Sequence, residues 1–513
     1  MSFFSRWFRN KPDAPERVPT DTVVPLFIQD DTDIFRSISM NFPMVFDDVL
    51  DVDKLVGAFQ QLLARPGWKK LGGRLRKNNE NKLEYHIPAE FTSSRPAVNV
   101  THVTHDMSIS AHALGAQLPR ATSSISLSSD TAKFHSLVLS PDGPTKLDHW
   151  IYQDRGQFHL HIVSFTDATI VTLTWLHTLL DAMGRNAVLR AWTASLEGRD
   201  IPEFYGYDVN PLAKFVESAS SYEGEEKFIL EGRLLSGWAL ARFGLGYLWN
   251  IFYRRAEMAR TICIPASTFK RIRQSCLRDL ESVDPSILTI DETNKSNATP
   301  FLSDGDILAA WFTRLQISGH PWSQTASPQT TITTMNVFGL RDLLTNTEPQ
   351  ILPKGVAYIG NCVSAIVSFF TLHEILSLPL GHLAARIRKD LVLQSTRTQQ
   401  ALCVHTNAKS IKETGRNILF GDSTMALIPF SNWAKAKLFE TDFSGAVVGG
   451  LEDKRKSRGR PTLIMPSGIA TGMLSTRNAA NVTGRDWEGN YWLSTCLTPD
   501  VWVEVEKAIQ GMD

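Results

Sequence analysis

The sequence contains a histidine and an aspartate whose spacing fits acid–base chemistry, His177 and Asp181, in the pattern H-x-x-x-D. An imidazole group titrates near neutral pH and can take a proton from an attacking hydroxyl group. The pattern alone is weak, because a chain with 13 histidines should hold on the order of one such pair by chance. A second pair, His102 and Asp106, is indeed present. The elements around each pair must therefore distinguish them.

Those elements differ between the two pairs. His177 follows the mostly apolar run 170–176, which is rich in β-branched and aromatic residues, and precedes a segment with helical spacing over 181–196. This order predicts a buried strand, a short loop and a helix, which would hold the imidazole rigidly beside a cleft. His102 lies in the alternating segment 98–103, which predicts a partly exposed strand residue. His177 is the candidate general base, although by spacing alone a histidine buried in the core is the commoner case.

Apolar periodicity predicts further helices and strands along the whole chain. Helical spacing occurs over 51–65, and Ser303 starts a capping-box sequence in front of another apolar helical face. Strand-like segments are residues 83–87, 98–103, 157–165, 169–175, 331–337, 363–370, 461–465 and 491–496. The two kinds of element interleave without a strict β-α-β repeat, which favours an α/β fold with mixed sheets.

A Pro-, Gly-, Ser- and Glu-rich segment, residues 202–226, predicts a crossover between two lobes. We expect an N-terminal lobe over residues 1–205, a linker over 206–230 and a C-terminal lobe over 231–513. The apolar stretch 234–253 carries Arg242 near its centre, which disfavours a helix that spans a membrane. We expect this stretch to pack against the protein rather than to bind a membrane.

Composition excludes several classes of protein. Lys plus Arg and Asp plus Glu both number 53 in the 513 residues, so the basic surplus of a nucleic-acid-binding protein is missing. The five cysteines form no C-x-x-C pair, which argues against a zinc site and against a disulfide framework. Arginines interrupt the N-terminal apolar residues too early for a secretory signal. We therefore expect a cytoplasmic protein without a bound metal.

Several segments, in the expected order, resemble the motifs of the BAHD acyltransferases, in particular those of their fungal branch. The segments are His177–Gly184 (H-x-x-x-D-A-M-G), Ser303–Trp311 (S-x-x-D-x-L-x-A), Asn336–Arg341 followed by Tyr358–Asn361 (Y-x-G-N), Ser431–Trp433 (S-x-W) and Asp442–Ala446 (D-F-G-W-G). The resemblance spans about residues 27–508. In two places the chain departs from the family pattern: Ala182 stands where many members have Gly, and Ser444-Gly445-Ala446 replaces G-W-G.

This resemblance implies two chloramphenicol-acetyltransferase-like lobes with a central channel. His177 would be the general base, with acyl-CoA as co-substrate and no bound cofactor. Asp181 would turn away from it and pair with Arg341, which would hold the loop in shape. Three residues, Asp442, Phe443 and Gly445, would shape the channel wall, with Gly445 meeting the demands of a tight loop. The basic residues Lys454, Arg455, Lys456 and Arg458 form either a solvated loop or a contact for the phosphates of coenzyme A.

The expected reaction is transfer of an acyl group, acetyl in the first place, from acyl-CoA to a hydroxyl group of a lipophilic small molecule of fungal secondary metabolism. We expect a monomer that binds no nucleic acid and does not insert stably into a membrane. One alternative is a condensation-type enzyme that uses carrier-protein thioesters, but Leu176 and Ala182 depart from its H-H-x-x-x-D-G signature. The other is a non-catalytic binding protein with the same fold, and the presence of both His177 and Asp181 argues against it.

Overall fold

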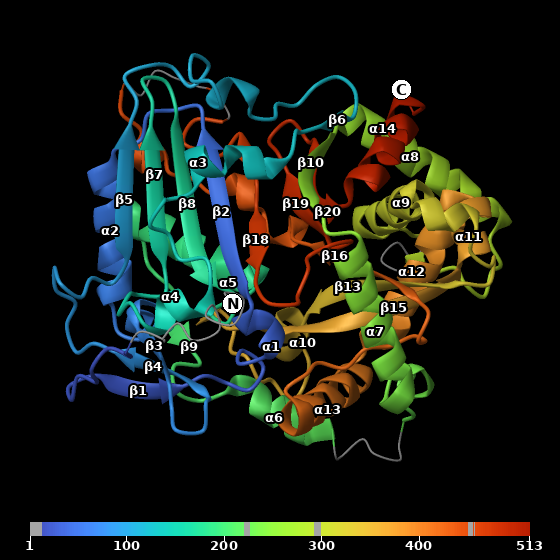
Figure 1. Ribbon diagram of the computed structural model, residues 1–513, viewed down its shortest axis with the longest axis horizontal. Helices are drawn as coiled ribbons and strands as arrows, with labels where there is room; N and C mark the ends of the chain where they lie inside the picture. Colours follow the sequence, from blue (N-terminus) through green and yellow to red (C-terminus); the bar gives the residue numbers. More distant parts are fainter. Residues whose placement is uncertain (1–12, 220–225, 292–298, 450–454, 456, 513) are drawn as a thin grey trace, which may run out of the picture.

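Two large mixed sheets organise the fold (Figure 1). The computed structural model describes residues 13–219, 226–291, 299–449, 455 and 457–512. In the first sheet the strand order is β17-β2-β8-β7-β5, with β18 also paired to β2. In the second it is β15-β13-β16-β19-β20-β10-β6. Each sheet contains both parallel and antiparallel pairs, which confirms the mixed α/β fold.

The strands of the first sheet are β2 (Ile38–Phe46), β5 (Asn99–Thr104), β7 (His159–Ser164), β8 (Thr169–Leu176), β17 (Leu463–Ile464) and β18 (Ser467–Ala470). Those of the second are β6 (Ser126–Leu127), β10 (Met258–Ile264), β13 (Thr331–Gly339), β15 (Val363–Thr371), β16 (Ala426–Asn432), β19 (Ala480–Arg485) and β20 (Tyr491–Leu497). Each sheet includes strands from the other part of the chain, β17 and β18 in the first and β6 in the second. The two sheets are therefore interlocked, and the division at residues 205 and 231 stays a prediction.

Helices cover both sheets through apolar faces that the sequence predicts. Beside the first sheet, α2 (Val52–Ala64) packs against α5 (Ala182–Leu196), and the Trp192 indole donates to the carbonyl oxygen of Leu55 at 2.9 Å. Beside the second, α9 (Asp304–Gly319) packs against α12 (Leu380–Gln394) and α14 (Pro499–Gln510). The capping box at the start of α9 is present, since Ser303 and Asp306 bond to each other's backbone N–H groups. These contacts confirm the predicted helices over 51–65, 181–196 and after Ser303.

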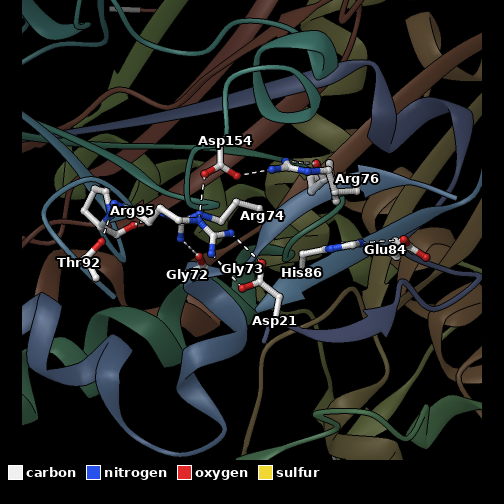
Figure 2. A network of polar contacts seen from close by, with 12 residues as sticks. Asp21, Gly72, Gly73, Arg74, Arg76, Glu84, His86, Thr92, Arg95 and Asp154 are labelled. Carbon is white, nitrogen blue, oxygen red and sulfur yellow. Dashed lines mark hydrogen bonds and ion pairs between the residues drawn. The ribbon is translucent and has the colours of Figure 1, made fainter. Parts of the chain in front are cut away.

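A small third sheet, of β1 (Thr22–Pro25), β4 (Leu83–Ile87) and β3 (Arg74–Lys77), is joined to its surroundings by a polar network (Figure 2). Arg95 donates two hydrogen bonds to Asp21, at 2.9 and 2.7 Å, and one to Asp154 at 3.1 Å. Asp154 also pairs with Arg76. Buried Arg74 donates to the carbonyl oxygens of Gly72 and Pro96. The guanidinium groups of this network thus all have oxygen partners.

The crossover region contains β9 (Phe204–Tyr205) and α6 (Pro211–Ser218). Beyond it, the apolar stretch forms α7 (Gly237–Tyr253), which lies at the front of the molecule in Figure 1. The stretch packs through one side only: Leu240 and Leu248 are half-buried and the Tyr247 hydroxyl accepts from the Ser475 N–H at 2.9 Å. No side chain of α7 is fully buried, and Trp238 and Trp249 are 79% and 72% exposed. Apolar residues surround the whole helix, so one side stays in solvent whichever side is attached. Among the described residues, no helix is both long and apolar enough to cross a membrane.

Candidate active site

His177 stands directly after β8, the fully buried strand Thr169–Leu176. The antiparallel pairing of β8 with β2 continues past the strand end, because the His177 N–H donates to the Ile38 carbonyl oxygen at 2.9 Å. The His177 carbonyl oxygen in turn accepts a hydrogen bond from Asn361 Nδ2 at 3.0 Å. The histidine backbone is thus fixed on both sides, by the first sheet and by the segment that leads into β15.

The imidazole of His177 is held flat against an aromatic ring. Phe35 of α1 (Asp33–Arg36) stacks on it with ring centroids 4.3 Å apart and planes 5° apart. Nδ1 is buried without a hydrogen bond to another residue, and the carbonyl group of His177 itself is the acceptor that favours a proton on the ring. A proton on Nδ1 leaves Nε2 as the basic nitrogen.

Burial is the main cause that lowers the pKa of His177 below its ordinary value, because it disfavours the charged imidazolium. The positive charge of Arg185 lowers this pKa further, whereas the negative charge of Asp181 raises it. The ring is therefore neutral at physiological pH, which is the protonation state that a general base requires.

Asp181 uses both carboxylate oxygens for structure. Oδ1 caps α5 by accepting from the Gly184 N–H at 2.8 Å. Oδ2 accepts from Arg341 Nη1 at 2.7 Å and from the Cys362 N–H at 2.9 Å. Neither oxygen bonds to His177, so the carboxylate acts on the base only through its charge and through the shape of the loop.

Arg341 extends this scaffold to the segment before β15. Its Nε donates to the Tyr358 carbonyl oxygen at 3.2 Å and its Nη2 to that of Gly360 at 2.6 Å. The segment approaches α5 so closely that a Cβ at Gly184 would lie 2.0 Å from the Ile359 carbonyl oxygen. Only glycine fits there, which gives a physical reason for the G of H-x-x-x-D-A-M-G.

Asn361 and Asp30 are site residues that the sequence analysis did not assign. The Asn361 N–H and Nδ2 both donate to Asp30 Oδ1 at 2.8 Å, while Nδ2 also holds the His177 carbonyl oxygen. Burial raises the pKa of Asp30 to about 7. Asn361 could have been found as the last residue of Y-x-G-N, whereas nothing in the local sequence of Asp30 or of Phe35 points to the site.

The loop Asp442–Ala446, called the D-F loop below, lies at the opposite end of β8 from His177. Phe443 is buried against Phe46, at 5.6 Å, and Phe46 pairs with Thr169 at the start of β8. Eight residues of strand, about 26 Å, separate that point from His177. The Asp442 carboxylate accepts from the Ser444 N–H at 2.9 Å and stabilises the turn.

The expected need for glycine at 445 is wrong. A Cβ there would make only ordinary contacts, the closest at 3.5 Å from the Leu196 side chain. The glycine that this loop requires is Gly459, which has φ +68° and would place a Cβ 2.3 Å from the Ser444 nitrogen.

The basic tract is near the D-F loop and is described only in part. Lys454 and Lys456 lie outside the described residues. Arg455 Nη2 donates to Asp48 Oδ1 at 2.8 Å, and Arg458 is half-buried. Arg455 thus already contacts a carboxylate, and a role of this tract toward coenzyme A stays a prediction.

Comparison with known proteins adds relatives that match nearly the full length. No protein-family model matches the chain. It is 35% identical to acetyltransferase adrJ of Penicillium rubens, over 100% of this chain and 99% of the relative. It is 33% identical to O-acetyltransferase PaAT-2 of Phomopsis amygdali, over 96% and 99%. It is also 35% identical to calD of Penicillium decumbens, which is named a transcriptional regulator, over 98% of both chains.

Solved structures of low sequence identity share the fold. TRI101 of F. graminearum, solved with coenzyme A and T-2 mycotoxin, superposes with a TM-score of 0.63 at 13% identity, over 95% of this chain and 97% of that one. Vinorine synthase gives a TM-score of 0.56 at 12% identity, over 98% and 96%. The predicted two-lobe, chloramphenicol-acetyltransferase-like fold is thereby confirmed. Given this fold and the identity to adrJ and PaAT-2 over nearly the whole of both chains, the protein belongs to the fungal acetyltransferase family with a BAHD-type fold.

Proposed function

We propose that this protein transfers an acetyl group from acetyl-CoA to a hydroxyl group of a lipophilic small molecule of fungal secondary metabolism. The observation that carries the proposal is the His177 imidazole at the end of a buried strand, where Phe35 stacks on the ring and Asn361 holds the His177 carbonyl oxygen. Full-length relatives named acetyltransferases, and TRI101 with its bound coenzyme A and mycotoxin, support the donor and the class of acceptor.

In the proposed reaction the acceptor's hydroxyl oxygen attacks the carbonyl carbon of the thioester while His177 Nε2 takes the hydroxyl proton. The carbonyl π electrons move to its oxygen, which becomes negatively charged in a tetrahedral intermediate. When this intermediate collapses, the C–S bond breaks and the coenzyme A sulfur receives the proton from the imidazolium. The result is an ester and free thiol, and the histidine returns to its neutral state.

The remaining residues serve this reaction indirectly in our proposal. Asp181 and Arg341 hold the catalytic loop, and the channel between the lobes admits the two substrates from opposite faces. Asp442 and Phe443 stabilise the channel wall at a distance from the chemistry. The tract from Lys454 to Arg458 binds coenzyme A phosphates. The enzyme acts as a cytoplasmic monomer.

Other activities fit the chain less well. A condensation-type enzyme would have histidine at Leu176, and a binding protein would have no need of a neutral base beside a fully bonded scaffold. The relative calD is named a transcriptional regulator, but a DNA-binding role fits this chain poorly. Its basic and acidic residues are equal in number, so it has no surplus of positive charge for the DNA phosphates.

Thiol release tests the proposal. Purified protein is incubated with acetyl-CoA and a panel of lipophilic alcohols, free coenzyme A is measured with a thiol reagent, and products are followed by mass spectrometry. We expect thiol release together with an acceptor that gains one acetyl group, and neither with the His177→Ala variant. Wild-type protein that binds neither acetyl-CoA nor coenzyme A would exclude an acetyltransferase.

A further inference from the structure

Arg185 is a buried cation beside the candidate base, and among the described residues two of its three guanidinium nitrogens have no hydrogen-bond acceptor. Its side chain is 2% exposed, and both Nε and Nη2 are buried without a hydrogen-bond acceptor in the described part of the chain. Burial lowers the pKa of Arg185 to about 9, so the group stays charged at neutral pH. A buried donor without an acceptor lowers stability, and the loss is larger when the donor is charged. A fold tolerates this cost most readily where a ligand supplies the acceptor.

The helix that carries Arg185 explains why these two nitrogens have no acceptor among the described residues. Arg185 follows Asp181 by one turn of α5, the spacing at which an aspartate and an arginine usually pair. Asp181 is already occupied, because its Oδ2 accepts from Arg341 and Cys362 and its Oδ1 accepts from Gly184. Arg185 is therefore left to extend away from the carboxylate.

Aromatic rings fix the direction of the Arg185 side chain. Its guanidinium carbon lies 4.0 Å from the ring centroid of Phe42, 4.3 Å from that of Trp433 and 5.9 Å from that of Trp175. Phe42 belongs to the first sheet and Trp433 follows β16 of the second, so the cation lies where the two lobes meet. Stacked rings hold the flat faces of a guanidinium group and leave its N–H groups, which lie in its plane, free to bond.

The same face of the first sheet presents His177. Phe42 lies opposite Leu173 in the β2–β8 register, and Trp175 and His177 follow Leu173 at intervals of two. Residues two apart along a strand point to the same side, so the Arg185 guanidinium and the imidazole lie over the same face of the sheet. The Arg185 charge accordingly acts on the pKa of His177.

We propose that Arg185 donates hydrogen bonds through Nε and Nη2 to the carbonyl oxygen of the acyl-CoA thioester. This inference rests on the proposed function. When the acceptor oxygen attacks the carbonyl carbon, the π electrons move to that oxygen, and the fixed cation neutralises the charge until the C–S bond breaks. No proton leaves Arg185 in this step. A donor of this kind, held in place before the reaction, typically contributes about a hundredfold to a thousandfold in rate.

Substitutions at Arg185 test the role in turnover. Arg185→Met keeps the length and the apolar contacts, and we expect kcat to fall by about a hundredfold or more with little change in KM for acetyl-CoA. The melting temperature should stay level or rise, because an unpaired buried charge is removed. The matched control is Arg74→Met, a buried arginine that donates to carbonyl oxygens, where the melting temperature should fall and kcat stay level. Near-normal kcat in Arg185→Met, or equal losses of kcat and melting temperature, would overturn the proposal.

Acceptor-independent hydrolysis of acetyl-CoA shows which substrate oxygen Arg185 serves. If it serves the acyl carbonyl, hydrolysis and acetyl transfer should fall in the same proportion. If the Arg185→Met variant hydrolysed acetyl-CoA at the wild-type rate but transferred the acetyl group slowly, Arg185 would bind the acceptor substrate, and our assignment would be refuted. Added methylguanidinium should partly restore Arg185→Ala, and it should not affect Arg74→Ala.

A binding measurement separates this proposal from the proposed function. S-ethyl-CoA lacks the carbonyl oxygen, so calorimetry should show that wild-type protein prefers acetyl-CoA by about five- to tenfold and that Arg185→Met loses the preference. Equal wild-type affinities would contradict the role of Arg185 alone. No binding of either thioether or thioester would refute the acetyltransferase itself.

Discussion

Buried arginines are arranged differently in two regions of the molecule. In the network of Figure 2, Arg95 bonds to both Asp21 and Asp154, and Arg76 pairs with Asp154. Arg74 donates through both terminal nitrogens to backbone carbonyls, and only its Nε lacks an acceptor among the described residues. At the candidate site, by contrast, Nε and Nη2 of Arg185 both lack an acceptor in the described part of the chain. Satisfied cations stabilise a fold, whereas an unsatisfied one lowers stability and is tolerated where it contributes to binding or catalysis. The arginines of the network in Figure 2 therefore stabilise the scaffold, whereas Arg185 has N–H groups left to bind a substrate.

The same distinction holds within the site, between Asp181 and His177. Every oxygen of Asp181 is bonded, while His177 has one nitrogen buried beside its own carbonyl and the other available. Replacing His177 should therefore lower the rate of catalysis, whereas replacing Asp181 should mainly lower stability.

Replacing the base should have the largest effect. His177→Ala removes a proton acceptor worth about 10²- to 10⁴-fold, so kcat should fall at least a hundredfold while the melting temperature and the affinity for coenzyme A change little. His102→Ala is the matched control, because His102 belongs to the second H-x-x-x-D pair and is exposed on β5. Steady-state kinetics and calorimetry measure both variants. Equal losses of kcat in the two variants would show that His177 has no special role as the base.

Replacing the scaffold should mainly reduce stability. Asp181→Ala leaves the partly buried guanidinium of Arg341 without its carboxylate and two N–H groups without an acceptor, at a cost on the order of 3 kcal/mol. Denaturant titration should show this loss, with Asp181→Asn intermediate. Asp342→Ala breaks the exposed pair with Lys435 and should change stability by less than about 1 kcal/mol. Comparable stability of the two Ala variants would mean that Asp181 is not a scaffold.

The basic tract should affect donor binding only. Replacing Lys454, Arg455, Lys456 and Arg458 together with Ala should raise KM for acetyl-CoA several-fold and leave kcat nearly unchanged, as loss of uniform binding does. The control is Lys507→Ala, which removes an exposed cation on α14 that pairs with Glu504 and should leave KM unchanged. An unaltered KM in the quadruple variant would show that the tract is a solvated loop.

The smallest effect on stability is expected on α7. Trp238, Trp249 and Phe252 are 79%, 72% and 60% exposed, so their replacement by Ser should hardly change the melting temperature. Replacing Trp192, which is buried on α5, by Ser is the contrasting change and should destabilise strongly. A clear drop in melting temperature for the α7 variant would show that these three side chains are packed in solution.

Local patterns predicted much of the molecule. The apolar run before His177 and the helical spacing after Asp181 predict β8 and α5 almost to the residue, because burial and capping act over a few neighbouring positions. Contacts between distant segments could not be predicted in this way, as with Asp30 on Asn361 or Phe35 on His177. Arg185 was missed because an arginine in a helix is usually exposed, and only the packing of both lobes shows that it is buried.

The pH dependence of kcat/KM most directly tests His177 as the base. The neutral ring is the active form, so activity should be present above its pKa and fall as the pH drops through it, with a midpoint below the ordinary histidine value of 6.5. Arg185→Gln removes a charge that lowers this pKa and should move the midpoint up; Asp181→Asn removes one that raises it and should move the midpoint down. Asp30→Asn, measured beside them, removes a second site group, whose pKa burial raises to about 7. We predict that Arg185→Gln and Asp181→Asn shift the midpoint in opposite directions and that Asp30→Asn keeps the acid limb of the kcat/KM profile. If neither charge change moved the midpoint, or if the acid limb disappeared in Asp30→Asn, His177 would not be the base.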